Sequence, residues 1–372
     1  YAPAEIGEQI YLESSLRKIT EEGLNKSSAK ILPIGTVLFT SRAGIGKTAI
    51  LLKEGCTNQG FQSIVPNKEK LDSYFIFTRS EELKRYGETV GAGSTFVEVS
   101  GKQMANMELM MPKTMLEQQQ IGNCFQSLDH LITLHQRKCD ETKKLKKYML
   151  QKMFPQNGSK VPEIRFEGFT DEWEQRKVSE IAMEKLSNGI MNNQSDDETG
   201  VKHINVINMY DTDKIHPEKL TFSNYDEEAV KKCNVEFGDI FLTRSSLKPE
   251  GIAEANVLLD SGRFVYDDHL IRLKINKEKY DPFFVKLNLS GNAFKRQFIV
   301  KAKTTAFTTI GQEDISECLG FFPKKEEQQQ IGEYFMLLDY LITLHQRKPP
   351  FTRILRKYTK ITKETTQMSE LE

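Results

Sequence analysis

The sequence predicts an α+β protein in which two strand-rich modules of mixed α/β structure are separated by two long helices. Three observations lead to this prediction. One segment of 22 residues occurs twice, both copies carry a helical pattern of apolar residues, and short β-branched and aromatic runs bounded by turn residues surround them. We expect the two helices to pack as an antiparallel coiled coil.

The repeated segment is EQQQIGNCFQSLDHLITLHQRK at residues 117–138 and EQQQIGEYFMLLDYLITLHQRK at residues 327–348. The copies agree at 17 of 22 positions, which indicates a chain built from duplicated halves. They lie 210 positions apart, a period far longer than that of solenoid repeats.

In the first copy, apolar residues recur at heptad spacing from Ile121 and Leu128 to Met149, and prolines flank the pattern. One helix is therefore expected from about Leu116 to Phe154, with a length on the order of 55 Å. Because a helix of that length outreaches a globular core, another helix must cover its apolar seam, and the second copy is the candidate. The alternative is an ordinary core helix with a solvated lysine face.

Composition narrows the class of protein. The 52 basic and 52 acidic residues give zero net charge, which argues against non-specific coating of DNA but not against local basic patches. The sequence has no apolar run near the roughly 18 residues of a membrane span and no signal peptide, so we expect no membrane association and a cytoplasmic location. Five cysteines without C-x-x-C spacing indicate reduced thiols and no metal site.

The first module is expected at residues 1–113. The run from Gly35 to Arg42 is typical of a strand that ends in Ser41 and Arg42, Gly60–Val65 is a second strand candidate, and Leu71–Arg85 has the pattern of a helix. The chain starts at Tyr1, inside what the repeat shows to be a module, so a fragment or trimmed gene product is expected.

Residues 43–48, AGIGKT, invite a phosphate-loop interpretation, but Ser41 stands where that motif needs a glycine. The second module has SSLKPEG at the matching place, without glycine-lysine-threonine. Arg42 and Lys47 beside glycines on a strand-end loop instead favour contact with nucleic acid, the arginine reading a guanine edge. A solvated hairpin tip is the alternative for these residues.

The second module follows a breaker-rich linker after Phe154 and is expected at residues 156–323, with a strand-like run at Val201–Asn208. Gly238–Arg244 repeats the design of Gly35–Arg42 and again ends in arginine. The second helix is expected at residues 324–348. Because two prolines follow it, each costing about 3 kcal/mol or more in a helix, we expect the helix to break near Arg347. The divergent tail at residues 349–372 is expected to be either diverged or misread coding sequence.

These motifs together resemble the specificity subunit of type I restriction-modification enzymes, over nearly the whole chain. The resemblance rests on the two EQQQIG helices, on the PEIRF…F…W run at Glu163–Trp173, on Gly35–Lys47 and on Asn58–Phe61. In that family each module is a target recognition domain that reads one half of a split DNA site, and the two helices are an antiparallel spacer, here at residues 114–155 and 324–348.

The resemblance also implies partners, cofactors and site residues. It implies a non-catalytic, cytoplasmic subunit of a defence system against foreign DNA, which binds double-stranded DNA, two modification subunits and, through them, restriction subunits. S-adenosylmethionine, ATP and Mg are expected on those partners and no cofactor on this chain. The residues expected to face DNA are Arg42, Lys47, Asn58, Gln59, Arg244 and Lys248. The helix residues expected in docking or in the spacer are Gln118, Ile121, Phe125, Leu128, Leu131 and Ile132, with Gln328, Ile331, Phe335, Leu338, Leu341 and Ile342 in the second copy.

Two departures from the family pattern are expected to lower activity: the first module lacks roughly 40 opening residues, judged from the second, and prolines interrupt the second helix. Among rival functions, an amino-methyltransferase would use an Asn/Asp-Pro-Pro motif, but Lys348 precedes Pro349 and its ammonium group accepts no hydrogen bond. A stand-alone two-module DNA-binding regulator stays open as the alternative function.

Overall fold

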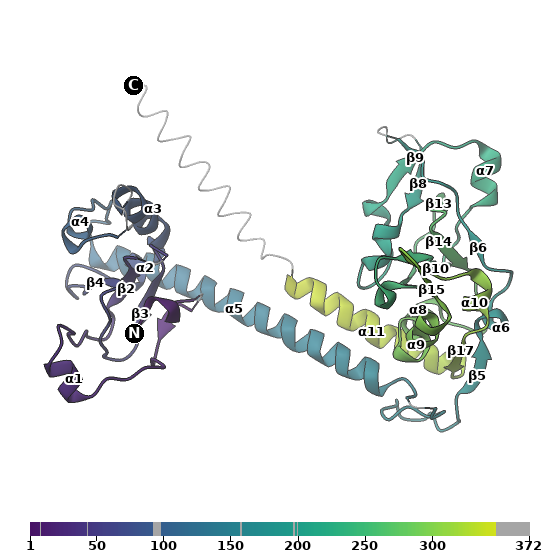
Figure 1. Cartoon of the computed structure of the whole chain (residues 1–372), viewed down its shortest axis with the longest axis horizontal. Coiled ribbons are helices and arrows are strands. Elements are labelled where there is room, and N and C mark those ends of the chain that lie inside the picture. Colours follow the sequence, from purple (N-terminus) through teal and green to yellow (C-terminus); the bar gives the residue numbers. More distant parts are fainter. Residues whose placement is uncertain are drawn as a thin grey trace. The chain divides into compact units, whose positions relative to one another are not determined.

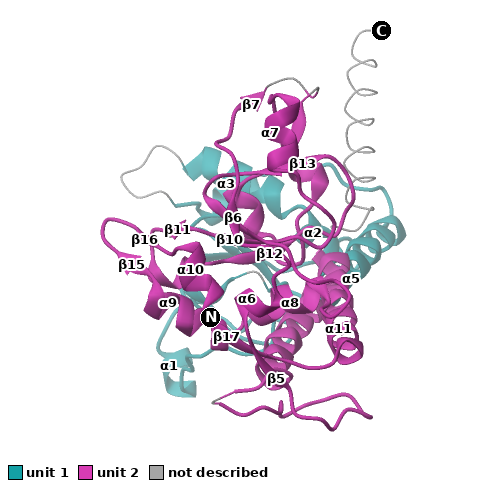
Figure 2. Ribbon diagram, turned by 90° about the vertical axis from the view of Figure 1, so that its right-hand side faces the viewer, with its two compact units in different colours: residues 1–134 teal, residues 135–372 magenta. Residues whose placement is uncertain are grey.

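The structure is a computed structural model that describes residues 1–7, 9–42, 44–91, 98–156, 158–195, 198 and 200–346. The chain divides into two compact units, unit 1 at residues 1–134 and unit 2 at residues 135–372, coloured separately in Figure 2. The division falls inside helix α5 (Met115–Lys152), which is 38 residues long. The prediction of one long helix in this region is therefore confirmed. No helix in the described ranges is long and apolar enough to cross a membrane.

Unit 1 is built around one four-stranded sheet of order β1-β3-β2-β4, in which β1 runs parallel to β3 and the other pairs are antiparallel. Val37, Phe39 and Ile50 point from this sheet into a core completed by Tyr74, Phe75 and Leu83 of the helices. The elements of unit 1 are η1 (Pro3–Glu5), β1 (Tyr11–Leu12), α1 (Glu21–Asn25), β2 (Val37–Thr40), β3 (Thr48–Leu51), β4 (Phe61–Ile64), α2 (Ser73–Thr78), α3 (Ser80–Gly91), α4 (Gly101–Ala105) and the first half of α5.

Unit 2 contains a sheet of order β12-β10-β14-β6, a second of order β13-β8-β9-β7, and the small sheets β11-β16-β15 and β17-β5. Its elements up to the centre of the main sheet are β5 (Glu174–Lys177), α6 (Val178–Ile181), β6 (Ser187–Asn188), β7 (Gln194–Ser195), β8 (Val201–Ile204), η2 (Val206–Tyr210), η3 (Pro217–Lys219), β9 (Thr221–Ser223), α7 (Glu227–Lys232) and β10 (Ile240–Thr243). The remaining elements are β11 (Ser245–Ser246), η4 (Pro249–Gly251), β12 (Ala255–Val257), β13 (Phe264–Tyr266), β14 (Leu270–Leu273), α8 (Pro282–Leu289), α9 (Asn292–Lys301), β15 (Lys303–Thr304), β16 (Thr308–Thr309), α10 (Gln312–Ser316), β17 (Leu319–Phe322) and α11 (Lys325–Gln346).

The two units share a frame of three antiparallel strands and a helix. In unit 1, β2 lies between β3 and β4, and in unit 2, β10 lies between β12 and β14. A glycine with positive φ precedes the central strand in both units, Gly35 at 86° and Gly238 at 87°, a conformation that side chains disfavour. Aspartate then caps the following helix in both, Asp72 before α2 and Asp281 before α8.

The strands predicted at Gly35–Arg42, Gly60–Val65 and Gly238–Arg244 are confirmed as β2, β4 and β10. Two predicted elements are corrected. The single helix expected at Leu71–Arg85 is two helices, α2 and α3, because the backbone leaves the helical conformation at Arg79. The strand expected at Val201–Asn208 ends at Ile204, where a 3₁₀ helix with Asn205 as its N-cap begins.

The repeated EQQQIG segments anchor each long helix to its own unit by the same hydrogen bonds. In unit 1, Gln118 Oε1 accepts from Asp72 N at 3.1 Å and Gln118 Nε2 donates to Lys70 O at 3.1 Å. In unit 2, Gln328 Oε1 accepts from Asp281 N at 3.0 Å, and Gln328 Nε2 donates to Lys279 O, the counterpart of Lys70 O, at 3.4 Å and also to Pro323 O at 2.8 Å. Both glutamines are buried, so the first half of the repeated sequence is explained by contacts inside the chain.

The glycine of each EQQQIG segment allows this close approach. A Cβ atom on Gly122 would lie 2.9 Å from Asp72 Oδ1, and one on Gly332 would lie 2.9 Å from Asp281 Oδ1. Real Cβ atoms do not approach that closely, so any side chain would push the helix away from the capping carboxylate. Glycine is therefore needed at both positions for packing.

Within unit 2 the second half of α5 packs antiparallel on α11, as Figure 1 shows. The contacting partners run in opposite directions along the two helices. His135 Nδ1 lies 3.2 Å from His345 Nδ1, Lys146 forms an ion pair with Asp339, and the ring centroids of Phe154 and Phe335 are 6.3 Å apart. The predicted antiparallel pair is confirmed for this segment.

The first half of α5 belongs to unit 1. Tyr74 donates to Asp129 Oδ2 at 2.7 Å, and Gln126 donates to Tyr11 Oη. The antiparallel pairing expected of residues 114–155 and 324–348 is therefore established for the segment of α5 that lies in unit 2, from His135 onward. The described part of α11 ends at Gln346. The expected break near Arg347, the Lys348–Phe351 motif and the tail lie outside the described residues.

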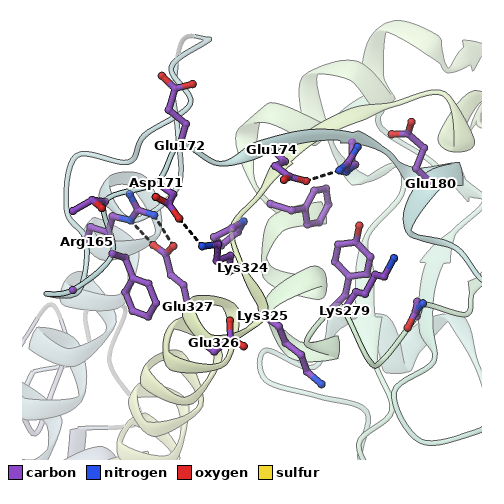
Figure 3. Close-up of a pocket in the computed structure, with 18 of the residues that line it drawn as sticks. Arg165, Asp171, Glu172, Glu174, Glu180, Lys279, Lys324, Lys325, Glu326 and Glu327 are labelled. Atoms are coloured by element: carbon purple, nitrogen blue, oxygen red, sulfur yellow. Dashed lines mark hydrogen bonds and ion pairs between the residues drawn. The ribbon is translucent and has the colours of Figure 1, made fainter.

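The PEIRF…W run holds the start of α11 through the contacts of Arg165 and Trp173 with Glu327, which together are called the clamp. Glu327 is 1% exposed, and both of its oxygens accept from Arg165, at 2.6 Å from Nε and 2.8 Å from a terminal nitrogen (Figure 3). Trp173, also buried, points its indole N–H at the same carboxylate. A pocket with paired charges on its walls, among them Asp171 and Lys324 at 2.7 Å, surrounds this clamp.

Replacing Gln328 by alanine should destabilise unit 2. The change leaves the Asp281 N–H and the Pro323 carbonyl without a partner in a buried place, which costs about 1–3 kcal/mol. Urea unfolding of the full chain measures the shift. Gln329→Ala is the matched control, because Gln329 is the exposed neighbour on the same turn and should change stability by less than about 0.5 kcal/mol. Equal effects of the two substitutions would contradict the anchoring role.

Candidate nucleic-acid interface

The loop after the central strand has the same internal support in both units. Thr40 Oγ1 donates to Gly44 O at 2.6 Å and accepts from Lys47 N at 2.9 Å. Thr243 Oγ1 donates to Gly251 O at 3.3 Å and accepts from Glu254 N at 2.9 Å. The threonine hydroxyl thus closes both loops, and the loop of unit 2 is longer by four residues.

The position after this threonine is tied to two neighbouring segments. Ser41 N donates to Gly60 O and Ser41 O accepts from Val99 N. Arg244 N donates to His269 O and Arg244 O accepts from Ile310 N. Arg244 is therefore equivalent to the buried Ser41. The predicted equivalence of Arg42 and Arg244 is off by one position, because β2 ends at Thr40 and β10 at Thr243.

Unit 2 presents cationic and aromatic side chains together at this edge. Arg244 and Lys248 are exposed on the loop, and Lys303 is exposed on β15, which joins the same small sheet through β16. Among described residues, none of these three cationic groups has a hydrogen-bond or ion-pair partner. A hollow beside them is lined by Tyr210, Leu247, Lys248 and Phe307. The side chain of Leu247 is 81% exposed and that of Phe307 is 54% exposed.

Unit 1 places its predicted residues at the corresponding edge. Arg42 is half-buried, and its guanidinium makes no side-chain hydrogen bond within the described ranges. Asn58 and Gln59 are exposed in the turn before Gly60, next to Ser41. Two of the predicted residues also have structural tasks: Lys47 Nζ donates to Ile6 O at 3.3 Å, and Asn58 Oδ1 accepts from Gly60 N at 2.9 Å.

The GIGK loop is a β-hairpin. It joins the antiparallel strands β2 and β3, and Gly44 and Gly46 take positive φ values of 103° and 97°. A phosphate loop instead connects a strand to a helix whose N-terminus holds the phosphates. The phosphate-loop interpretation is therefore excluded.

Sequence reasoning missed Tyr210, Leu247, Phe307 and Lys303 as interface residues. The available signal was the combination of exposed aromatic residues with Leu247-Lys248 on a loop, but their approach depends on the pairing of β11 with β16, which joins residues more than 60 positions apart. That pairing has no local sequence pattern.

Comparisons with known proteins identify the class of this protein: its two units are two copies of a DNA specificity domain. A family model described as the type I restriction modification DNA specificity domain matches residues 4–144 and again residues 170–350. The chain therefore belongs to the family of specificity subunits of type I restriction-modification systems.

Two relatives come from Methanocaldococcus jannaschii. The type I restriction enzyme MjaIX specificity subunit is 34% identical over 147 residues, which is 39% of this chain and 32% of the relative. The putative type I restriction enzyme MjaX specificity subunit is 26% identical over 121 residues, 32% of this chain and 28% of the relative. Each match thus spans about a third of the relative's length.

A solved structure has the same fold. The S subunit of a type I restriction-modification system from M. genitalium superposes with a TM-score of 0.56 at 13% identity, covering 95% of this chain and 87% of that one. The α+β class with two modules and long helices is therefore confirmed.

Replacing Arg244 by alanine should relax base preference in one half of the DNA site only. If the guanidinium reads a base edge, the change costs about 1–3 kcal/mol at that position. Selection from a randomised DNA pool measures it. Arg263→Ala is the control, because Arg263 is an exposed arginine of the same unit that pairs with Glu227. Uniform weakening on all sequences would assign Arg244 to phosphate contact, and Arg42→Ala tests the other half-site in the same way.

Proposed function

We propose that this chain is the DNA sequence-recognition subunit of a type I restriction-modification system, in which each unit reads one half of a split site. The observation that carries the proposal is the repeated frame: the same threonine-closed loop is presented twice, and the residue after the threonine is Ser41 in one unit and Arg244 in the other. A repeated frame with divergent loops is what two independent half-site readers require.

The chemistry of the edge in unit 2 fits double-stranded DNA. Arginine can bind the guanine O6 and N7 atoms together, and lysines such as Lys248 and Lys303 neutralise phosphates. The exposed side chains of Tyr210 and Phe307 add apolar contact for thymine methyl groups or sugars. Because the net charge is zero, such binding depends on local cationic surfaces like this one and not on the charge of the whole chain.

The helices are proposed to dock modification subunits through residues that the chain itself leaves exposed. On α11 these are Met336, Leu337, Tyr340 and Leu344, which are 38–59% exposed and recur at helical spacing. The repeated residues Gln328, Ile331, Phe335, Leu338 and Ile342 are buried instead. Of the predicted docking residues of α5, Phe125 and Leu131 are 40% and 48% exposed.

The two copies therefore differ on their outer faces. Where α11 has Met336, Leu337 and Tyr340, the first copy has Gln126, Ser127 and His130. The shared sequence therefore does not give two identical docking surfaces, because much of it faces inward. One helical turn further along, both copies keep an exposed leucine, Leu134 in α5 and Leu344 in α11. Two related but unequal docking sites are therefore proposed.

Catalysis belongs to the partners in this proposal. Methyl transfer from S-adenosylmethionine to adenine takes place on modification subunits, and ATP and Mg act on restriction subunits that join through them. This chain supplies DNA specificity and the spacing between two methyltransferases in the cytoplasm, each of which can take a flipped adenine from one strand. The antiparallel pair supports this arrangement, because His135 and His345, the same residue of the two copies, lie 3.2 Å apart, as residues next to a two-fold axis do.

Binding to a randomised DNA pool, with and without a modification subunit, tests the function. We expect enrichment of a split sequence only in the presence of the modification subunit. Tight, sequence-specific binding by the chain alone would instead favour the stand-alone regulator.

The double substitution Leu337→Ser with Tyr340→His gives α11 the outer residues of α5. It should weaken the attachment of one modification subunit, because it removes exposed apolar area that contributes about 25 cal/mol per Å² when buried. Native mass spectrometry of the reconstituted complex counts the subunits, with two expected for the unmodified chain. The reverse change, Ser127→Leu with His130→Tyr, is the control and should strengthen the other site. A single modification subunit at all concentrations would reject the two-site arrangement.

A further inference from the structure

A cluster of histidine and aspartate side chains lies beside Arg244 in unit 2. The turn Asp267-Asp268-His269 joins β13 to β14, and one donor atom from each of the three residues lies within 4.8 Å of the others. His269 Nδ1 is 2.9 Å from Asp267 Oδ1 and 2.9 Å from Asp268 Oδ1. Two carboxylates are thus held together at the edge of the sheet.

A fourth residue, His203, faces this turn from inside the protein. His203 lies on β8, which pairs with β13, and its side chain is 0% exposed. Its Nε2 atom is 3.9 Å from Asp267 Oδ2 and has no hydrogen-bond partner among the described residues. An unpaired buried ring nitrogen costs free energy, so its position next to a carboxylate calls for an explanation.

The hydrogen bonds around Tyr225 indicate which nitrogen of His203 carries the proton. The Tyr225 hydroxyl donates its single proton to Met191 O at 2.8 Å and accepts from Asn193 N at 2.9 Å. It lies 3.1 Å from His203 Nδ1, so Nδ1–H is assigned as the donor of that bond. Nε2 of the neutral ring then holds a lone pair that points toward Asp267.

Two electron-pair donors, the ring nitrogen and the carboxylate oxygen, therefore face each other without a proton between them. Zinc binds histidine nitrogen at about 2.0–2.1 Å and carboxylate oxygen at about 2.0–2.2 Å, so two donors on one tetrahedral ion lie about 3.3 to 3.5 Å apart. The two atoms are 3.9 Å apart, so a movement of the Asp267 carboxylate by about 0.5 Å brings both onto one ion.

We propose that His203, Asp267, Asp268 and His269 form a binding site for a divalent transition-metal ion of the zinc class. His203 Nε2 and Asp267 are buried and fixed, whereas the side chain of His269 is 61% exposed and can turn toward the ion. Imidazole and carboxylate ligands together favour Zn²⁺ over Mg²⁺. Tyr225 orients His203 through its Nδ1–H, as partners of metal-bound histidines commonly do.

The site also differs between the units. The turn equivalent to Asp267-Asp268-His269 in unit 1 is Asn58-Gln59-Gly60, since Gly60 O and His269 O accept the matching backbone bonds. The turn of unit 1 carries no charge, while that of unit 2 places two carboxylates next to Arg244. A bound cation neutralises these carboxylates, which otherwise repel DNA phosphates. This consequence rests on the proposed function, whereas the metal site does not.

Zinc titration of the chelator-treated full chain by calorimetry tests the site without DNA. We expect one Zn²⁺ ion per chain, loss of binding in Asp267→Asn and His269→Ala, and affinity reduced by about 10 to 100-fold in Tyr225→Phe. Cobalt substitution should give the visible absorption of a nitrogen- and oxygen-ligated ion. His216→Ala is the matched control, because both ring nitrogens of His216 already meet carboxylates, those of Asp213 and Glu218.

The absence of saturable Zn²⁺ uptake by the folded chain would overturn the proposal, as would uptake unchanged in His269→Ala. His269 is exposed, so this variant decides the matter even if Asp267→Asn fails to fold. DNA binding is measured separately: chelation should weaken contact with the half-site of unit 2 alone. Zinc uptake without that effect would support the metal site and reject its link to DNA.

Discussion

The hydrogen bonds of two buried glutamine side chains connect the helices to the modules, and the rest of the architecture depends on them. Gln118 accepts from the backbone N–H of Asp72, which caps α2, at 3.1 Å, and Gln328 accepts from that of Asp281, which caps α8, at 3.0 Å. A glutamine amide can satisfy a donor and an acceptor at once, so each contact leaves little unpaired. The direction of each long helix is thereby fixed relative to the strand frame of its own unit.

In unit 2, the linker between α5 and β5 also holds α11 in place, through a bond from Arg165 to Glu327. Glu327 is buried, and the two-pronged bond from Arg165 offsets the cost of removing its charge from water. Phe154 connects this clamp to the core, since its ring stacks on Phe284 at 5.5 Å and meets Trp173 edge-on at 6.0 Å. The end of α5, the linker and the start of α11 therefore form one packed unit. This packing gives the Glu163–Trp173 run a structural role, because its Arg165 and Trp173 hold the start of α11.

Sequence reasoning predicted the features that depend on local pattern. The heptads gave α5, and the runs ending at Thr40 and Thr243 gave the central strands. It failed where distant segments meet. Arg42 was matched with Arg244 by residue type, but Arg244 is equivalent to Ser41, and only the backbone bonds of these two residues to His269 and Gly60 reveal this equivalence. Likewise, His203 and Asp267 lie more than 60 positions apart, so their approach follows from the parallel pairing of β8 with β13 and not from spacing.

The duplication separates what the fold needs from what recognition needs. Residues shared by the two copies include the inward-facing glutamine and glycine, which must satisfy the same geometry twice. Residues that differ lie on outer faces, such as Ser127 against Leu337, or in edge turns, such as Gln59 against Asp268. Even a shared residue changes its task with its surroundings: Asp129 accepts from Tyr74, whereas Asp339 pairs with Lys146. Identity between the copies therefore marks common architecture, and partner or base specificity has to be sought in the positions where they diverge.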